Sequence, residues 1–359
     1  MSASHCNPSF DASLSKERLK EILRCCTALR LGVVGDLALD AYWYADMARS
    51  SLSRETPRFP RPVVREAYAP GAGANVACNL QALGVGQVTV FSVLGDDWRG
   101  TVLRQELARR GVAAQHLVIS PARSTTAYVK PILLGYDSQQ EDARLDFENP
   151  VPLSPALEKA LVRAIVQHLP ELGALVVTDQ LDTNGVITGR VREELNELAA
   201  RYPGKPCVAD SRQRIGLFRH MALKPNRMEA LAALYPDRDP QTVSRQELAE
   251  IGQALSQRSG RPVFITLGEH GALVCAESQQ RHLPAAPVHP PLDPVGAGDA
   301  FVAALAAALA VGATPWEAGA LANLAAAVTV EKLNQTGTAS PDEILARYDL
   351  VQAGVKREA

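Results

Sequence analysis

Short apolar runs alternate along the chain with longer segments whose apolar positions follow the period of a helix. Runs of this length, bounded by polar or glycine-rich turns, are typical of strands buried on both faces. The alternation therefore predicts an α/β fold in which helices cover both faces of a mostly parallel sheet. We expect strands at 31–34, 88–94, 175–177, 207–209 and 263–266, and helices at 74–83, 101–110, 186–200 and 248–256.

Two segments depart from this alternation. Residues 42–70 are rich in Arg, Ser and Pro, and polar and apolar side chains alternate through residues 125–148, as in an antiparallel strand with one exposed face. We interpret both as strands of a small β lid inserted into the α/β domain. Residues 297–330 are rich in Ala and predict two close-packed helices, separated at Gly312 and Pro315.

The ends of the chain carry no predicted chemistry. Ser13 and Ser15 precede a helix-like stretch at 16–25, which we interpret as a capped surface helix. The predicted organisation is an N-terminal extension at 1–30, a main domain at 31–348 and a C-terminal tail at 349–359.

Charge and composition exclude several classes of function. The 37 Lys and Arg residues nearly balance 39 Asp and Glu, so no basic field attracts nucleic acid or anionic lipid. The longest uncharged stretch, 300–316, is shorter than the ~20 apolar residues that a membrane helix needs. The sequence opens with no signal-peptide pattern, and its six cysteines show no C-x-x-C spacing. We expect a soluble cytoplasmic protein with reduced thiols and no structural zinc.

A run of small residues before an apolar helix is the strongest chemical signal. Gly296, Ala297 and Gly298 allow an anion to approach backbone N–H groups, and the helix that follows adds a partial positive charge. The run therefore predicts an anion hole. Asp299, in the first turn of that helix, is placed to take a proton from a hydroxyl that attacks phosphorus. The alternative is an ordinary glycine-rich turn with a capping aspartate.

Several short motifs follow one another along residues 31–346. They are Gly-Asp at 35–36, Gly-Ala-Gly-Ala-Asn at 71–75, Gly-Asp-Asp at 95–97, Asn-Arg-Met-Glu at 226–229, Thr-Leu-Gly-Glu-His-Gly at 266–271 and Gly-Ala-Gly-Asp at 296–299. In this order they resemble the motifs of the ribokinase-like (PfkB) sugar-kinase family. The resemblance implies that family's fold, its use of ATP and Mg²⁺, and sugar phosphorylation; it leaves a monovalent-cation requirement open.

Within that family, residues 35–44, 55–57 and 144–148 look like the bacterial heptose 7-phosphate kinases of lipopolysaccharide-precursor synthesis. The resemblance implies ATP-dependent phosphorylation of the anomeric hydroxyl of D-glycero-D-manno-heptose 7-phosphate to the 1,7-bisphosphate. Many such relatives carry a nucleotidyltransferase domain, but none of the seven histidines here forms its H-x-G-H pair, so we expect a stand-alone kinase. The sequence departs from the family at Pro294, which supplies no backbone donor, and in a longer, Arg-rich lid.

The sugar site is expected at the carboxyl ends of the strands, where open α/β sheets bind ligands. Asp36 follows the first strand and is predicted to accept hydrogen bonds from vicinal sugar hydroxyls; otherwise it is a turn residue. Gly73 and Asn75 suit further hydroxyls, and Asn75 also suits a helix N-cap. Asp179, at the end of the strand at 175–178, is a weaker candidate for the same crevice.

The nucleotide side is assigned through the same resemblance. Asn226 and Glu229 fall three apart on one helical face, which suits Mg²⁺ binding through water, although such a pair is more often solvated surface. The residues predicted to hold ATP are Asn226, Glu229, Thr266, Gly268, Gly271 and, beside the adenine, Asn323.

A distal sugar phosphate requires cations. Lys130 and Arg144 lie on the two halves of the second lid segment, with an alternation that points both inward. A solvated lid face is an equally good explanation for either one. Further lid cations are Arg49, Arg54, Arg58 and Arg61.

Other functions fit less well. A Walker P-loop is absent from the sequence, and residues 71–76 lack the third glycine of a dinucleotide-binding loop. The remaining rivals are another PfkB kinase with an unphosphorylated substrate, such as a fructokinase or ribokinase, and a catalytically silent sugar or nucleotide sensor. The partner is thus predicted to be a small sugar phosphate, with no nucleic acid or membrane. Lid strands with an exposed apolar face would pair with a second copy, so we expect a homodimer joined through the lids.

Overall fold

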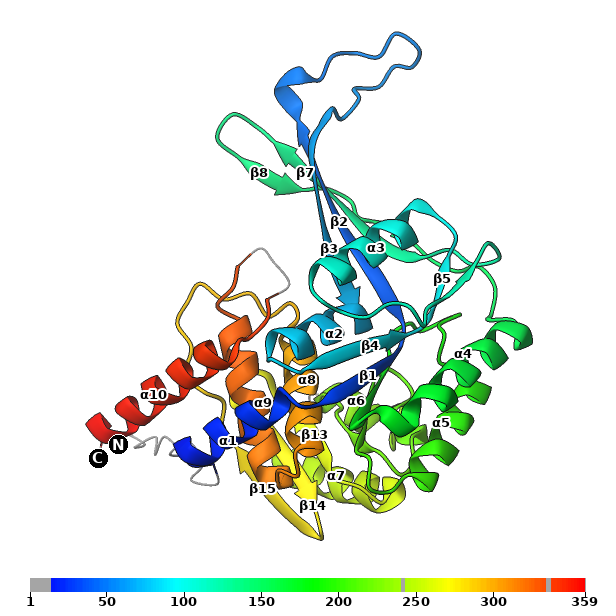
Figure 1. Cartoon of the computed structure of the whole chain (residues 1–359). Helices are drawn as coiled ribbons and strands as arrows, with labels where there is room; N and C mark the ends of the chain where they lie inside the picture. The colour runs from blue at the N-terminus through cyan, green and yellow to red at the C-terminus, as the bar shows by residue number, and fades with distance from the viewer. Residues whose placement is uncertain (1–13, 240–242, 334–336, 359) are drawn as a thin grey trace.

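The predicted parallel sheet forms the centre of the computed structural model, which describes residues 14–239, 243–333 and 337–358. The sheet is parallel from β4 to β13 and ends in an antiparallel hairpin, which confirms the expected mostly parallel α/β fold (Figure 1). Its strands, in spatial order, are β15 (Gln279–Leu283), β14 (Ala272–Ala276), β13 (Val263–Thr266), β12 (Ala222–Leu223), β11 (Cys207–Ser211), β10 (Ala174–Asp179), β1 (Arg30–Gly35) and β4 (Gln87–Phe91).

Helices bury both faces of this sheet. Val33 faces one core and Val34 the other, because successive strand residues point to opposite faces; this is why the strands appear in the sequence as unbroken apolar runs. The first core is lined by α1 (Lys16–Cys26), α2 (Gly73–Ala82), α3 (Trp98–Arg109), α8 (Ala297–Ala310), α9 (Pro315–Thr329) and α10 (Pro341–Glu358), and the second by α4 (Pro155–His168), α5 (Gly189–Arg201), α6 (Arg227–Ala232) and α7 (Arg245–Ser259).

Local hydrogen bonds set two boundaries that apolar periodicity placed wrongly. The helix expected from residue 186 begins at Gly189, because the Thr188 hydroxyl caps it by accepting from the Val191 N–H at 3.2 Å. Val186 instead gives its N–H to Asp36. The strand expected at 88–94 is two strands, β4 and β5 (Val93–Gly95), and β5 pairs with β6 (Val118–Ser120) in a separate small sheet.

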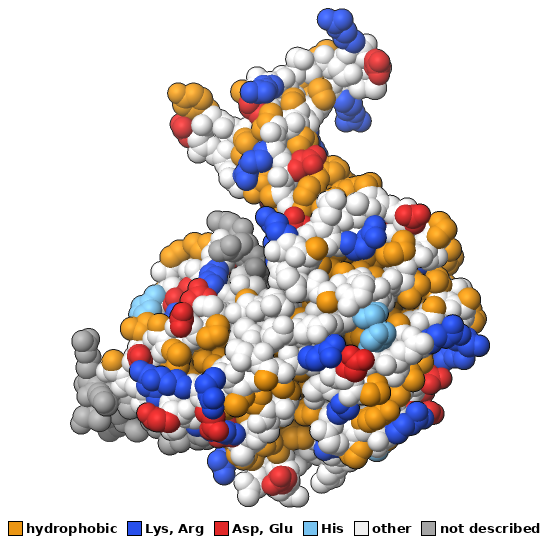
Figure 2. Space-filling view, viewed as in Figure 1, with side chains coloured by type: hydrophobic (Ala, Val, Ile, Leu, Met, Phe, Trp, Pro, Cys, Tyr) orange, Lys and Arg blue, Asp and Glu red, His pale blue; other side chains and the backbone are white. Residues whose placement is uncertain are grey.

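The lid is a second sheet that projects from the α/β body (Figures 1 and 2). The lid begins at residue 37 rather than 42, because the chain passes from β1 of the main sheet to β2 of the lid with only Asp36 between the two strands. The expectation of antiparallel pairing is half right: β7 runs antiparallel to β8 and β9 but parallel to β2. The lid strands are β2 (Leu37–Asp46), β3 (Val63–Ala72), β7 (Thr126–Leu134), β8 (Gln139–Glu141) and β9 (Leu145–Phe147).

The two ends of the described chain pack together. Ser15 caps α1, as predicted, whereas Ser13 lies outside the described residues. Lys16 forms an ion pair with Asp349 at 2.6 Å, and the Tyr348 hydroxyl donates to the Leu14 carbonyl at 3.0 Å. Helix α10 runs through residue 349, so the predicted boundary of a C-terminal tail falls inside a helix.

No helix among residues 14–239, 243–333 and 337–358 is both long and apolar enough to cross a membrane.

A pair of histidines whose rings are in contact predicts a pH-dependent stability. The His116 and His168 rings lie 3.7 Å apart, and Phe91 stacks on His116 at 5.7 Å. Burial, and then the neighbouring His168, lower the pKa of His116 below its ordinary value of 6.5. Protonation therefore favours the unfolded chain, and this contribution to stability, complete above pH ~6.5, is lost as pH falls through the folded pKa.

We predict that His116→Gln flattens the pH dependence of the unfolding free energy between pH ~7.5 and ~5.5. Urea denaturation at several pH values measures it. If the unfolding free energy of the variant changed with pH as steeply as that of the wild type, protonation of His116 would not contribute to the pH dependence of stability.

Candidate active site

The predicted anion hole lies at the start of α8. Gly296 adopts the left-handed conformation with φ 83° and is the N-cap residue, and no side chain of the described residues caps the helix. The first-turn N–H groups of Gly298 and Asp299 are therefore available to an anion, and a Cβ built on Gly298 would meet only the Lys224 Nζ, at 3.9 Å. The site thus has the donors and the space that a phosphate group requires.

Asp299 is joined to the Gly-Ala-Gly-Ala-Asn motif at 71–75 by a direct hydrogen bond. The Asn75 Nδ2 donates to the Asp299 Oδ2 at 2.7 Å, which links α2 to α8. Burial raises the pKa of Asp299 to about 6, and the bond from Asn75 opposes that rise. A carboxylate with this pKa is ionised at neutral pH but protonates readily, as a general base requires.

The structure corrects the alternative role of Asn75 as a helix cap. Helix α2 begins at Gly73 after Ala72, so Asn75 lies inside the first turn. Gly73 itself packs tightly, since a Cβ there would lie 2.3 Å from the Thr178 Oγ1 and 2.9 Å from the Asp36 carbonyl oxygen. Glycine at 73 therefore brings α2, and with it Asn75, against the carboxyl edge of the sheet.

A buried ion pair beside Asp299 was not recognised in the sequence. Lys224 and Asp210 are each 5% exposed, and their Nζ and Oδ1 atoms lie 3.1 Å apart. Burial lowers the pKa of Lys224, but Asp210 and then Glu229 outweigh it, and the net pKa is raised. The available signal was a charged residue directly after each of two buried strands.

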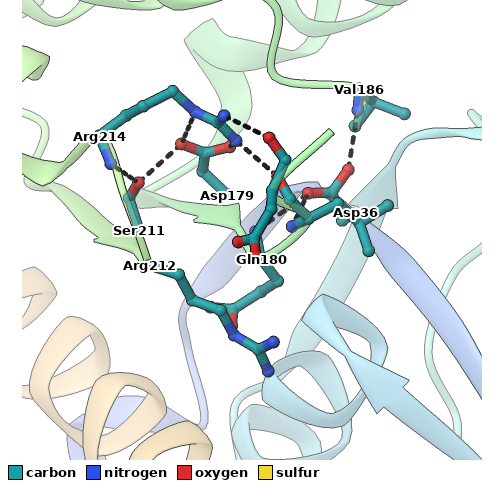
Figure 3. Close-up of polar contacts among 9 residues, drawn as sticks. Asp36, Asp179, Gln180, Val186, Ser211, Arg212 and Arg214 are labelled. Carbon is teal, nitrogen blue, oxygen red and sulfur yellow. Dashed lines mark hydrogen bonds and ion pairs between the residues drawn. The ribbon is translucent and has the colours of Figure 1, made fainter. Parts of the chain in front are cut away.

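Arg212 is a second residue that sequence reasoning missed. Its side chain leaves the end of β11, and its guanidinium lies apart from Arg214 and Asp179 in Figure 3. Its Nε donates to the Gln180 Oε1 at 3.1 Å, and its charge lowers the pKa of both Asp299 and Tyr128. Arg212 thus supplies an exposed positive charge between the α/β body and the lid.

Asp36 is buried at the carboxyl end of β1, but its carboxylate is already occupied. It accepts hydrogen bonds from the N–H groups of Gln180 and Leu181, both at 2.9 Å, and of Val186 at 2.7 Å (Figure 3). Burial still raises its pKa to about 6. These bonds hold the loop at 180–186 over the sheet, a role that the turn position of Asp36 in the sequence does not reveal.

Asp179 is likewise engaged. Its two oxygens accept from Arg214 at 2.6 and 2.9 Å, and Oδ2 also accepts from the Ser211 hydroxyl at 2.6 Å. Figure 3 shows Arg214 and Ser211 converging on the Asp179 carboxylate. The structure therefore brings Asp36 and Asp179 close together without leaving either carboxylate free.

On the predicted nucleotide side, a cavity of about 330 Å³ is lined by Asn226, Thr266 and Gly268, together with parts of α6 and α7. Asn226 and Glu229 form a reciprocal capping box at the start of α6, with bonds of 2.7 and 2.8 Å. This gives both residues a structural role beside any role toward a metal. Among the described residues, no cluster of three or more His, Cys, Asp or Glu side chains suits direct metal coordination.

The other two predicted nucleotide residues do not line this cavity. A Cβ on Gly271 would lie 2.2 Å from the Leu283 carbonyl oxygen, so glycine is needed there for packing. Asn323 is buried and donates to the Leu283 and Pro284 carbonyls at 3.2 and 3.1 Å.

The lid presents a paired set of charges at its base. Lys130 lies 3.4 Å from Asp40 and donates to the Tyr42 hydroxyl at 3.3 Å. Asp40 also faces the glycine motif at 71–75, since a Cβ built on Gly71 would lie 2.8 Å from the Asp40 Oδ2. Burial raises the pKa of Asp40, and Lys130 opposes this rise. Asp40, on lid strand β2, is therefore a candidate sugar-facing carboxylate that the sequence analysis did not single out.

Three of the remaining lid cations are held by local partners, whereas Arg54 and Arg58 are exposed. Arg144 forms a two-point contact with Asp146 at 2.6 and 2.7 Å and covers the Tyr128 ring at 4.8 Å. Arg144 also acts on the pKa of Asp40, which places it near Lys130. Two arginines of the first lid segment pair with lid aspartates, Arg49 with Asp46 and Arg61 with Asp142.

A carboxylate at an uncapped helix N-terminus, on the carboxyl edge of a parallel sheet and beside a β lid, is the arrangement of the ribokinase-like sugar kinases. Residues 39–186 and 204–343 match the model of the pfkB family of carbohydrate kinases. The chain belongs to the PfkB family.

Comparisons with individual proteins agree with this assignment. The chain is 33% identical to the bifunctional protein HldE of Trichlorobacter lovleyi over 94% of its length, and 36% identical to that of Methylococcus capsulatus over 88%. It spans only 66% and 63% of those two proteins.

Solved structures share the fold at about 20% identity. Phosphofructokinase-2 from Escherichia coli, in complex with potassium, superposes with a TM-score of 0.70 at 20% identity, covering 90% of this chain and 99% of that one. Ribokinase from Arabidopsis thaliana, complexed with ribose and ATP, gives 0.64 at 19% identity, with coverage of 89% and 98%. These likenesses show the ribokinase-like fold.

The buried ion pair predicts a measurable asymmetry. Lys224→Met leaves Asp210 buried without its counter-ion, so we expect a loss of roughly 3–5 kcal/mol in the free energy of unfolding. Asp210→Asn combined with Lys224→Met removes both charges and should restore much of that loss. Urea unfolding of the single and double variants tests this; equal losses in both would mean that the ion pair does not determine the stability here.

Proposed function

We propose that this PfkB kinase transfers the γ-phosphoryl group of ATP to the anomeric hydroxyl of a heptose 7-phosphate. The observation that carries the proposal is the Asn75–Asp299 hydrogen bond, which fixes a carboxylate of raised pKa beside the free N–H groups of α8. The similarity to HldE proteins over most of the chain supports the heptose substrate.

In the proposed reaction, Asp299 accepts the proton of the sugar hydroxyl as its oxygen bonds to the γ-phosphorus and the bond to ADP breaks. The N–H groups at 298 and 299 stabilise the charge that develops on the phosphoryl oxygens. Lys224, held by Asp210, adds a fixed positive charge close to these N–H groups, since its Nζ would lie 3.9 Å from a Cβ built on Gly298.

Mg²⁺ would neutralise charge on the phosphates, and Asn226 and Glu229 are the residues that would hold it through water. Glu229 fits this role because the capping box uses only its Oε2, so Oε1 remains to hold a bound water, and Asn226 lies beside it with its Oδ1 already accepting from the Glu229 N–H. The cavity lined by Thr266 and Gly268 adjoins them and would receive part of the nucleotide.

The sugar would lie between Asp299 and the base of the lid. Asp40 is oriented toward Gly71 and suits the sugar hydroxyls, whereas Asp36 supports the site from behind through the loop at 180–186. For the distal phosphate we retain Lys130 and Arg144, with Arg212 as an additional cation facing the same space. Binding there would exchange the Asp40 and Asp146 partners for the phosphate.

The lid would also join two copies of the chain. Its exposed apolar side chains, on the strands and on the connections between them, support this proposal, because apolar surface left in water favours association. They are Leu52, Phe59, Val63, Val64, Tyr136 and Leu145.

The general-base role predicts a specific kinetic defect. Asp299→Asn should lower kcat by roughly 10²–10⁴-fold with little change in the KM for ATP or sugar. In the wild type, kcat should fall below pH ~6, because the pKa of Asp299 is raised to about 6 and only the ionised form accepts the proton. Steady-state kinetics across pH measure both; a variant with more than about a tenth of wild-type kcat would contradict the assignment.

The distal-phosphate subsite predicts a substrate-specific defect. Lys130→Met or Arg144→Met should raise the KM for heptose 7-phosphate about ten- to a hundredfold and leave the KM for ATP unchanged, since each charge-assisted contact contributes roughly 1.5–3 kcal/mol. Arg65→Met is a matched control, because this lid arginine stacks on Tyr44 at 3.5 Å.

A panel of sugars tests the substrate itself. Normal heptose 7-phosphate kinetics in both variants would move the subsite to Arg212 or to the arginines of the first lid segment. A wild-type preference for an unphosphorylated hexose or pentose would favour a fructokinase-like or ribokinase-like activity, and no turnover on any sugar would favour a sensor.

A further inference from the structure

A second cavity lies behind the loop that holds Asp36. Its volume is about 250 Å³, and it is formed where the segment after β9 meets the start of α5. Pro152, Leu153 and Ile187 supply an apolar wall. The remaining lining residues are polar, charged or glycine: Asn184, Gly185, Thr188, Gly189, Arg192 and Arg214.

Arg192 is the unusual member of this lining. Its Nε is buried and has no hydrogen-bond partner among the described residues. Its Nη2 lies close to the first residue of α5, since a Cβ built on Gly189 would lie 3.7 Å from it. A half-buried guanidinium thus lies beside the positive end of a helix, an unfavourable position unless an anion completes it.

The neighbouring charges do not complete it. Arg214 commits its guanidinium to Asp179 and to the Leu181 and Asp182 carbonyls. Arg219 is paired with Glu193 at 3.0 Å.

Charges of both signs surround Arg192. Burial is the largest influence on the pKa of Arg192 and lowers it, Asp179 and Glu193 oppose that shift, and Arg214 and Arg219 add to it. Glu158 accepts a hydrogen bond from the Thr188 hydroxyl. The feature that favours an anion in this cavity is therefore the Arg192 guanidinium itself, whose Nε has no hydrogen-bond partner among the described residues.

We propose that this cavity binds a small phosphate-class oxyanion, with the Arg192 guanidinium as its principal ligand. A guanidinium offers a fork of N–H donors that matches phosphate oxygens, and Gly189, the first residue of α5, lines the same cavity. The apolar wall at Leu153 and Ile187 leaves room for a short organic group, so both inorganic phosphate and a small phosphomonoester fit this chemistry.

This site is separate from Asp299. The loop at 180–186 lies between them: Gly185 borders both the cavity and Asp36, since a Cβ there would lie 2.8 Å from the Asp36 Oδ1. The side chain of Gln180 continues the loop to Asp210, with its Nε2 donating to Oδ2 at 3.1 Å. The proposal does not depend on which sugar the enzyme phosphorylates.

Titration calorimetry of the full chain with inorganic phosphate tests the proposal at constant ionic strength. We expect Arg192→Gln to weaken phosphate binding at this site at least about tenfold, because a charge-assisted two-point contact is lost. Arg190→Gln is the matched control: Arg190 lies on the same turn of α5, is exposed, and does not line the cavity. Its phosphate affinity should equal that of the wild type.

Equal phosphate affinity in Arg192→Gln and the wild type would overturn the proposal, as would an equal loss in Arg190→Gln, which would indicate a general charge effect. A crystal of the wild-type protein soaked in tungstate keeps the proposal falsifiable if Arg192→Gln does not fold. Anomalous density beside Arg192 supports the site, and density confined to the start of α8 refutes it.

Discussion

The buried carboxylate of Asp36, which forms no ion pair with any of the described residues, holds the carboxyl edge of the sheet together. Three main-chain N–H groups from the loop at 180–186 solvate it in place of water, and its own carbonyl accepts from the Gly73 N–H at 2.9 Å. The end of β1, the loop after β10 and the start of α2 are thereby fixed to one another. Asn75 and, through it, Asp299 inherit their positions from this junction.

The chemistry at this edge depends on charges that compensate one another away from water. Lys224 remains charged in a buried position because Asp210 and Glu229 raise its pKa, and Asp299 acquires a pKa of about 6 because burial outweighs the bond from Asn75. The parallel sheet makes this possible, since the ends of neighbouring strands bring residues distant in sequence to the same edge. At the base of the lid, Lys130 and Asp40 pair at 3.4 Å, so each charge partly offsets the cost of removing the other from water.

Much of this was legible in the sequence. Unbroken apolar strands specified a parallel sheet buried on both faces, and small residues before Asp299 specified an uncapped helix start, because both depend on local geometry and periodicity. The glycine motif was recognised, and the structure adds that glycine at 73 is required by close packing against Thr178. The family resemblance predicted the fold and the sugar-kinase class, and the match to the pfkB family and to solved structures confirms them.

Other features were decided only by the tertiary structure. The sequence alone did not reveal that the Asp36 carboxylate accepts hydrogen bonds from the loop at 180–186, or that Asp40 faces the glycine motif at 71–75. It also did not reveal the ion pair of Lys224 with Asp210. Each of these contacts joins segments that are separated in the chain. The unpaired position of Arg192 is of the same kind, since α5 carries several arginines and only their packing distinguishes them. Periodicity and short motifs determine which elements form and what chemistry they carry; the pairing of buried charges is set by long-range geometry and desolvation.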